Sequence, residues 1–315
     1  MEWFTKSRLF DLARQGQRLT SHRGGHSALI FICAFRSTRS HSSGNYHGIN
    51  LWVYRNRHFH ERRPPLEAGF WMSLQLILSF VLVYAILWAW LKFFEKRPFW
   101  TLGYEAKNAL MQYGRGFLAG ALMFGGAVAI LAVTGGVVFE QGDPTQQGFA
   151  ALGGVIIVLL GWIVQGGAEE VLIRGWVLPV IGARYKPWIG LLVSSLIFAL
   201  LHGLNPGLSV IALINLALFG VFAGLYAMRE GSMWGISALH SVWNWVQGNF
   251  FGFEVSGTNA GGGTLLNLKE TGADWLTGGA FGPEGGLAVT IVLVIAIAVT
   301  LFWKSKAIIQ EVIVE

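Results

Sequence analysis

The sequence predicts an all-α, multi-pass transmembrane bundle of about seven helices, with a long Gly-rich loop before the last helix. The 315 residues are 53% hydrophobic and 13% charged, with a mean hydropathy of +0.51, whereas a soluble domain carries about 25% charge. So few charges cannot cover a water-facing surface, which excludes a soluble enzyme. Apolar runs long enough to cross a bilayer recur along the chain. The single Cys excludes a disulfide framework and a Cys-based zinc site.

Residues 1–64 form a basic leader that differs from the rest of the chain. They hold 11 of the 23 Lys and Arg residues and three of the 17 acids, so the other 12 bases face 14 acids. The excess positive charge is confined to the leader, and we expect no nucleic-acid partner. The leader's apolar run, residues 28–35, is far shorter than the roughly 20 residues of a spanning helix. We expect a poorly ordered leader or tail, followed by a membrane-embedded domain at residues 65–315.

Seven apolar segments follow the leader. The second contains four glycines that let a neighbouring helix approach closely, namely Gly116, Gly120, Gly125 and Gly126. The third acquires charges near its far end, and the fourth is short for a span. A Gly-rich loop at residues 252–286 precedes the last segment, and a loop of this length is uncommon without a function or fold of its own. The segments are residues 70–94, 115–139, 149–181, 188–202, 208–228, 233–251 and 287–303.

The loops between these segments predict the orientation of the bundle. Connections that share one side carry ten bases, Lys92, Lys96, Arg97, Lys107, Arg115, Arg184, Lys186, Arg229, Lys304 and Lys306. The opposite side carries Lys269 and six acids. Because basic loops stay on the cytoplasmic side, we expect the first group to be cytoplasmic in a multi-pass protein of the cell membrane. Seven spans would then place the basic N-terminus outside, against the same rule, so the topology of the leader stays open.

Five ionisable residues stand out inside the apolar segments, namely Glu169, Glu170, Arg174, His202 and His240. Six of the eight His residues are in the leader, and the other two both fall in apolar segments. The charges of Glu169, Glu170 and Arg174 at mid-membrane depth would raise the free energy of insertion by about 8–10 kcal/mol. The apolar residues beside them lower it by only about 2–4 kcal/mol. The charged turn must therefore be paired, line a water-filled cavity or lie near an interface, and each outcome makes it a candidate functional site.

Helical spacing assigns different neighbours to the two adjacent acids. Glu170 and Arg174 lie four residues apart on one helix and can form an ion pair. Glu169 is rotated by about 100° from Glu170 and faces elsewhere. The spacing therefore predicts one paired carboxylate and one that is available for chemistry.

Two further segments each present a polar pair on one helix face. His202 follows Phe198 by four residues, and Asn244 follows His240 by four. Together with Glu169, these side chains are a sufficient set for hydrolysis. A Glu can take a proton from water, a His can orient that water or ligate a metal, and a His with an Asn can donate hydrogen bonds to an oxyanion.

Three motifs in order resemble a known family. The letters at residues 169–174 match EExxxR, those at 198–202 match FxxxH, and those at 240–244 match HxxxN. Together they resemble the CAAX-protease and bacteriocin-processing family of intramembrane endopeptidases, relatives of the type II CAAX prenyl protease. Residues 276–286, LTGGAFGPEGG, also look like a loop that bacterial members carry before their last helix. The resemblance covers roughly residues 70–305.

The resemblance implies hydrolysis of a peptide bond in a membrane-associated peptide or protein. Carried over by motif, Glu169 activates the water with His202, while His240 and Asn244 stabilise the oxyanion. Glu170 and Arg174 support the site.

The cofactor stays open, because the family is described both as metalloproteases and as metal-free glutamate enzymes. A carboxylate and two His suit zinc, and the ligands would then be Glu169, His202 and His240. The sequence has no HExxH motif, and its two His lie on separate helices. Spacing therefore does not decide between zinc and a metal-free site.

Two other functions use the same residues. Buried Glu and His also serve a membrane transporter or proton relay, although no inverted repeat relates the two halves. The third reading is a non-catalytic, immunity-type membrane protein that retains the fold. The complete set of motif residues argues against such a loss of catalytic activity.

Overall fold

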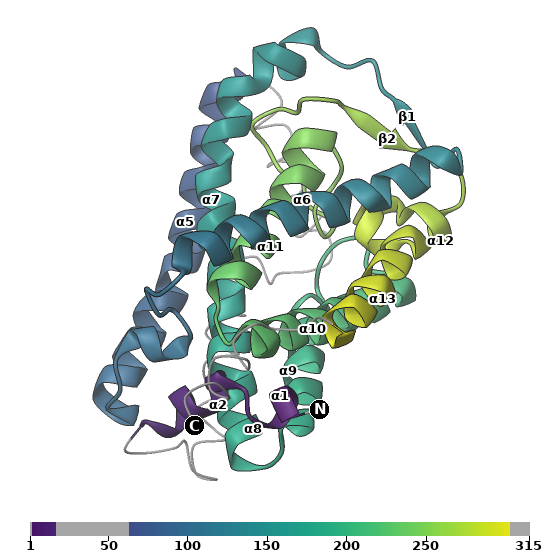
Figure 1. The fold of residues 1–315 in the computed structure, drawn as a ribbon. Helices are drawn as coiled ribbons and strands as arrows, with labels where there is room; N and C mark the ends of the chain where they lie inside the picture. The colour runs from purple at the N-terminus through teal and green to yellow at the C-terminus, as the bar shows by residue number, and fades with distance from the viewer. Residues whose placement is uncertain (1, 17–62, 303–315) are drawn as a thin grey trace.

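The computed structural model describes residues 2–16 and 63–302. The prediction of an all-α membrane bundle is confirmed, and each of the seven predicted segments corresponds to a helix (Figure 1). The first two are α5 (Pro65–Trp90), which continues into the π-helix η2 (Leu91–Glu95), and α6 (Ala109–Val133). The third is a continuous rod of α7 (Leu152–Glu170), the π-helix η6 (Val171–Val177) and α8 (Leu178–Arg184).

The other four segments complete the bundle. They form α9 (Pro187–Leu201), α10 (Val210–Glu230), α11 (Trp234–Trp245), which continues into the π-helix η7 (Val246–Phe251), and α13 (Leu287–Phe302). Within the described residues, four helices are long and apolar enough to cross a membrane, at Pro65–Glu95, Ala109–Val133, Gly148–Arg184 and Val210–Glu230. The chain is therefore a multi-pass membrane protein.

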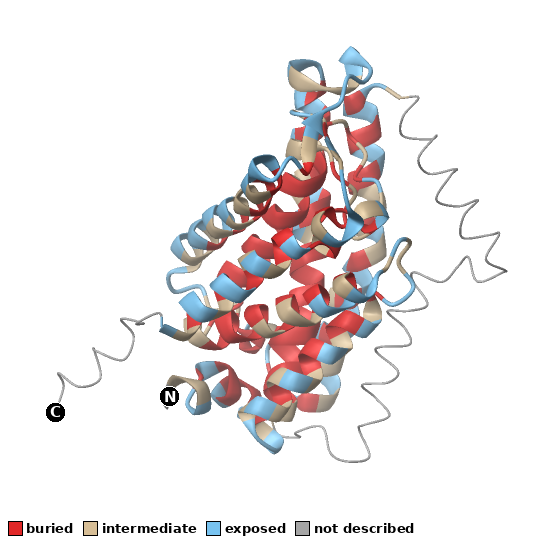
Figure 2. Ribbon diagram, turned by 90° about the vertical axis from the view of Figure 1, so that its right-hand side faces the viewer, coloured by how far each residue is buried: buried red, intermediate tan, exposed pale blue. Residues whose placement is uncertain are grey.

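The helices pack around α7 and α11. Helix α5 runs beside α7, α11 packs against both α6 and α7, and α10 packs between α9 and α13. Figure 2 shows buried residues along the inner faces and exposed residues along the outer ones. Exposed Leu78, Leu122 and Val299 show that these outer faces are apolar, as lipid contact requires. The polar side chains of α7 and α11 consequently face each other inside the bundle.

Only two of the four α6 glycines named in the sequence analysis provide a close helix contact. A Cβ at Gly116 would lie 1.8 Å from the carbonyl oxygen of Gly235, and one at Gly120 would lie 2.5 Å from that of Leu239, so α6 touches the backbone of α11 at both points. A Cβ at Gly125 or Gly126 would meet nothing within 4 Å. The prediction of close approach is right for the first pair and wrong for the second, because the second pair faces away from α11.

The second segment also ends earlier than the sequence suggests. Helix α6 stops at Val133, and residues 137–139 form the strand β1 (Val137–Phe139), which pairs antiparallel with β2 (Leu268–Glu270). Gly135, with a φ of +72°, breaks the helix. Strand β2 belongs to the 252–286 loop, which also contains the short helix α12 (Asp274–Thr277).

Residues 2–16 of the leader are packed against the bundle. They form α1 (Glu2–Thr5) and α2 (Arg8–Arg14), and α2 buries Leu9 and Phe10 against α8 and the 3₁₀ turn η3 (Phe99–Leu102). A Cβ at Gly182 of α8 would lie 2.4 Å from the Phe10 ring. The sequence predicts a poorly ordered leader because the leader is basic and its apolar run is short, whereas residues 2–16 form these two docked helices. Residue 1 and residues 17–62 of the leader lie outside the described residues, whereas residues 63 and 64 are described.

Candidate active site

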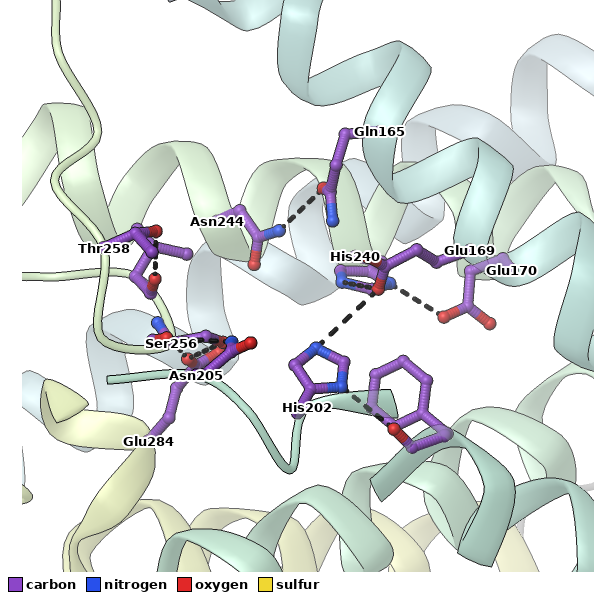
Figure 3. Close-up of polar contacts among 12 residues, drawn as sticks. Gln165, Glu169, Glu170, His202, Asn205, His240, Asn244, Ser256, Thr258 and Glu284 are labelled. Atoms are coloured by element: carbon purple, nitrogen blue, oxygen red, sulfur yellow. Dashed lines mark hydrogen bonds and ion pairs between the residues drawn. The ribbon is translucent and has the colours of Figure 1, made fainter. Parts of the chain in front are cut away.

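Three helices bring Glu169, His202 and His240 together (Figure 3). Glu169 lies near the end of α7, His202 directly follows α9, and His240 is in the middle of α11. The Oε2 atom of Glu169 is 3.9 Å from the Nε2 atom of each imidazole. The three residues are 2%, 5% and 5% exposed. The carboxylate therefore faces two ring nitrogens at equal distances in the interior of the bundle.

The other ring nitrogens fix the orientation of both imidazoles. His202 Nδ1 lies 2.9 Å from the Phe198 carbonyl oxygen, and His240 Nδ1 lies 2.8 Å from Glu170 Oε1. A carbonyl and a carboxylate only accept hydrogen bonds, so both Nδ1 atoms donate. Each neutral ring then presents the lone pair of Nε2 toward Glu169. The Nε2 atoms of both rings therefore face the same place beside Glu169.

Glu170 and Arg174 form the ion pair that their spacing predicts. Arg174 Nη1 donates to Glu170 Oε1 at 2.9 Å, although η6 begins between them and widens the helical turn. Both side chains are fully buried. The Arg174 guanidinium also lies over the Phe198 ring, 4.3 Å from its centroid. The Phe of FxxxH thus contacts the Arg of EExxxR, while Glu170 contacts the His of HxxxN.

The buried charges do not balance when both imidazoles are neutral. Glu169 and Glu170 carry two negative charges, and Arg174 carries one positive charge in the same buried cluster. One additional proton on this cluster would make it neutral. An uncompensated buried charge is costly, so a proton bound within the cluster reduces this imbalance.

Asn244 contacts a residue that the sequence analysis does not single out. Its Nδ2 atom donates to Gln165 Oε1 at 2.9 Å, and both residues are buried. Gln165 lies one helical turn before Glu169, just as Asn244 lies one turn after His240. The only sequence signal for Gln165 is this four-residue spacing from Glu169 in an apolar helix.

The 252–286 loop reaches the same site through Glu284, a second residue that sequence reasoning missed as a site residue. A cavity of about 20 Å³ is bordered by His202, His240, Ser256 and Glu284, with apolar side chains of α10 and α13. Such a volume holds about one water molecule. Glu284 accepts from Trp243 Nε1 at 3.0 Å and from Ser256 N and Oγ at 2.8 and 2.7 Å. Burial raises the pKa of the Glu284 carboxyl. Ser256 and Glu284 of the loop thus line the same cavity as both imidazoles.

The donor chemistry of the three central groups suits zinc, but their spacing does not. Zinc bonds of about 2.0–2.2 Å in a tetrahedral site place neighbouring donors about 3.4 Å apart, whereas Glu169 Oε2 lies 3.9 Å from each imidazole Nε2. Within the described residues, no group of three or more His, Cys, Asp or Glu side chains is arranged to hold a metal ion. The residues as placed do not fit zinc.

Comparison with known proteins gives a family match over this part of the chain. The family model for type II CAAX prenyl endopeptidases, Rce1-like, matches residues 151–246. This segment contains Glu169, Glu170, Arg174, His202, His240 and Asn244. The predicted resemblance is confirmed, and the match supports a CAAX-type protease of the membrane. Neither the curated proteins nor the solved structures gave a match.

Proposed function

We propose that this chain is an intramembrane endopeptidase that hydrolyses a peptide bond of a membrane-associated peptide or protein with water activated by Glu169. One observation carries the proposal: the Glu169 carboxylate lies 3.9 Å from both imidazoles inside an apolar bundle. A carboxylate between two ring nitrogens is suited to proton transfer. The family match over the same residues supports proteolysis rather than transport.

Glu169 and His202 prepare the attacking water. The water gives one proton to Glu169 as its oxygen bonds to the scissile carbonyl carbon, and His202 Nε2 accepts a hydrogen bond from the remaining O–H. The tetrahedral intermediate then collapses, the C–N bond breaks, and the proton held by Glu169 passes to the leaving nitrogen. The Phe198 carbonyl keeps the His202 lone pair directed at the water because it accepts from Nδ1.

His240 and Asn244 stabilise the oxyanion. His240 Nδ1 already donates to Glu170, so its Nε2 donates to the substrate oxygen when the ring carries the one proton that neutralises the cluster. Asn244 Nδ2 has two hydrogens, of which one goes to Gln165. The other is available to the oxyanion. Glu170 and Arg174 hold the imidazole in place through their shared contacts.

The test is cleavage by the purified full chain in liposomes. The substrates are quenched fluorescent peptides, one carrying a farnesylated CAAX terminus and one carrying a single apolar helix. We expect cleavage of at least one peptide, and a loss of about a hundred- to ten-thousand-fold in E169Q and in H202A. The control is E67Q, because Glu67 lies at the start of α5 and pairs with Arg63. Wild-type rates in E169Q would contradict the proposal, as would proton flux without any cleaved product.

Metal dependence is tested in the same assay. Because the donors are spaced too widely for zinc, we propose that cleavage continues after dialysis against a chelator. Complete loss of cleavage, restored by zinc and not by magnesium, would contradict this part of the proposal and would assign Glu169, His202 and His240 as ligands.

A further inference from the structure

The contact between Gln165 and Asn244 extends the site by one residue. Gln165 is on α7, four residues before Glu169, so the two side chains project from the same face of the helix. Asn244 is on α11, four residues after His240. Helices α7 and α11 therefore meet in two successive layers, with Gln165 and Asn244 in one and Glu169 and His240 in the next (Figure 3).

The backbone sets the register of these layers. A Cβ at Gly166 would lie 2.7 Å from Ser241 Oγ and 2.8 Å from the backbone nitrogen of Ser241, so α7 and α11 touch there. Gly166 follows Gln165 and Ser241 follows His240. This contact prevents the helices from sliding past each other, and it holds Gln165 opposite Asn244.

The hydrogen bond between the two amides has a definite direction in the structure. The Asn side chain has an oxygen and a nitrogen of nearly equal size, and stabilising an oxyanion requires the nitrogen. Asn244 Nδ2 donates to Gln165 Oε1, and this hydrogen bond turns Nδ2 toward α7, the helix that carries Glu169. Among the described residues, Gln165 is the hydrogen-bond partner found for the Asn244 side chain. Without it, the amide is free to turn its oxygen toward the substrate and repel the oxyanion.

We propose that Gln165 is a positioning residue for the hydrolysis: its Oε1 orients the Asn244 amide so that Nδ2 donates to the oxyanion. This inference rests on the proposed function of Asn244. It assigns a role to a residue outside the three sequence motifs, and Gln165 acts through Asn244 without touching the substrate.

The experiment is a double-mutant cycle on the peptide that the wild-type chain cleaves. The variants are Q165M, N244A and the two combined. Removal of one oxyanion donor typically lowers kcat by about 10²–10³-fold, and we expect Q165M to lower kcat by about tenfold to a hundredfold with KM nearly unchanged. In the N244A background, Q165M has no further effect, because there is no amide left to orient. The matched control is Q112M, since Gln112 Oε1 accepts from Ser232 Oγ at 2.9 Å, between α6 and the turn before α11.

A second variant separates positioning from packing. Q165E keeps the accepting oxygen and the side-chain volume but adds a buried charge four residues from Glu169, so we expect its kcat to lie between those of wild type and Q165M; it also decides the matter if Q165M does not fold. Wild-type kcat in Q165M, an equal loss in wild-type and N244A backgrounds, or equal losses in Q165E and Q165M would each overturn the inference. The proposed function fails separately, when E169Q cleaves like wild type. The Gln165 inference is judged only after E169Q has been shown to abolish cleavage.

Discussion

At the scale of single residues, one carboxylate oxygen connects the three motifs. Glu170 Oε1 accepts from Arg174 Nη1 at 2.9 Å and lies 2.8 Å from His240 Nδ1. Arg174 in turn lies over the ring of Phe198. All of these groups are buried. Any change that removes one partner therefore leaves a charge or a polar atom without compensation inside the bundle.

The ion pair predicts a specific pattern of stability. R174M leaves the buried Glu170 carboxylate without its cation, and breaking a buried pair in this way costs about 3–5 kcal/mol. E170Q combined with R174M removes both charges, so we expect it to be less destabilised than R174M alone. Unfolding of the purified variants in detergent, followed by circular dichroism, measures both. If the double variant is less stable than R174M, the buried charge of Glu170 is not compensated by Arg174.

Some site residues could be predicted from the sequence and others could not. Glu169, His202 and His240 stand out because ionisable residues are rare in apolar helices, and helical spacing adds Arg174. Gln165 is uncharged, so composition does not mark it. Glu284 contacts Trp243 of α11, 41 positions away, and Ser256, 28 positions away in the same loop. Such contacts depend on how the loop folds back, which local patterns do not contain.

At the scale of secondary structure elements, polar side chains of η7 hold the 252–286 loop in place. Gln247 Nε2 donates to the Glu254 carbonyl at 2.6 Å, and Asn249 Nδ2 donates to the carbonyls of Gly261 and Gly263 at 2.6 and 3.1 Å. Since η7 continues α11, the helix that carries His240 also anchors the loop beside the site. π-helical turns frequently occur at functional sites.

The glycines of α6 allow a matched test of helix packing. G120A would place a Cβ 2.5 Å from the Leu239 carbonyl oxygen and push α6 away from α11, whereas G125A meets nothing within 4 Å. We expect G120A to lower the melting temperature and the cleavage rate together, because α11 carries His240. G125A should leave the cleavage rate nearly unchanged and keep or slightly raise the melting temperature, since Ala is the better helix former by about 1 kcal/mol. Equal melting temperatures for the two variants would contradict the packing described here.

The pairing of β1 with β2 should weaken as the pH rises. Burial raises the pKa of Glu270 to about 7, and the nearby Glu254 and Glu140 act in the same direction. Because the folded pKa exceeds the ordinary value of 4.5, the protonated carboxyl stabilises the folded loop below about pH 4.5, and this contribution is lost as the pH rises through 7.

Hydrogen exchange of the β1 and β2 amides measures this effect. After correction for intrinsic exchange rates, we expect protection in wild type to fall between pH 5.5 and 8, as linkage to a raised pKa requires. E270Q has the same shape without the titration, so its protection should not vary with pH in this range. The same decline in E270Q would mean that Glu270 is not its source.

The sequence predicts the existence of the helices more accurately than the residues at which they end. All seven segments are helical because their apolar runs are long, but the end of α6 depends on Gly135. The π-helical turns of η6 and η7 have no signature in hydropathy. Helix α2 was missed because four buried residues suffice to dock it on α8, namely Leu9, Phe10, Leu12 and Ala13, and so short a pattern is weak in a basic leader.

At the scale of the whole molecule, the charged ends of the helices predict its orientation in the membrane. Lys107 precedes α6 and Gln141 follows it, so these exposed residues lie at opposite ends of one long apolar helix. Basic ends remain cytoplasmic. In a C33S background, we expect a membrane-impermeant maleimide to label the Q141C variant in intact cells and the K107C variant only after permeabilisation. The reverse labelling pattern would show that the bundle has the opposite orientation in the membrane.

The central claim is that Glu169 activates the water that cleaves the substrate. It is tested most directly by mass spectrometry of the peptide cleaved by wild-type and E169Q protein in isotopically labelled water. The account predicts one heavy oxygen atom in the new carboxylate for wild type, and almost no product for an E169Q protein that melts at the wild-type temperature. Labelled product formed by E169Q at the wild-type rate would contradict it.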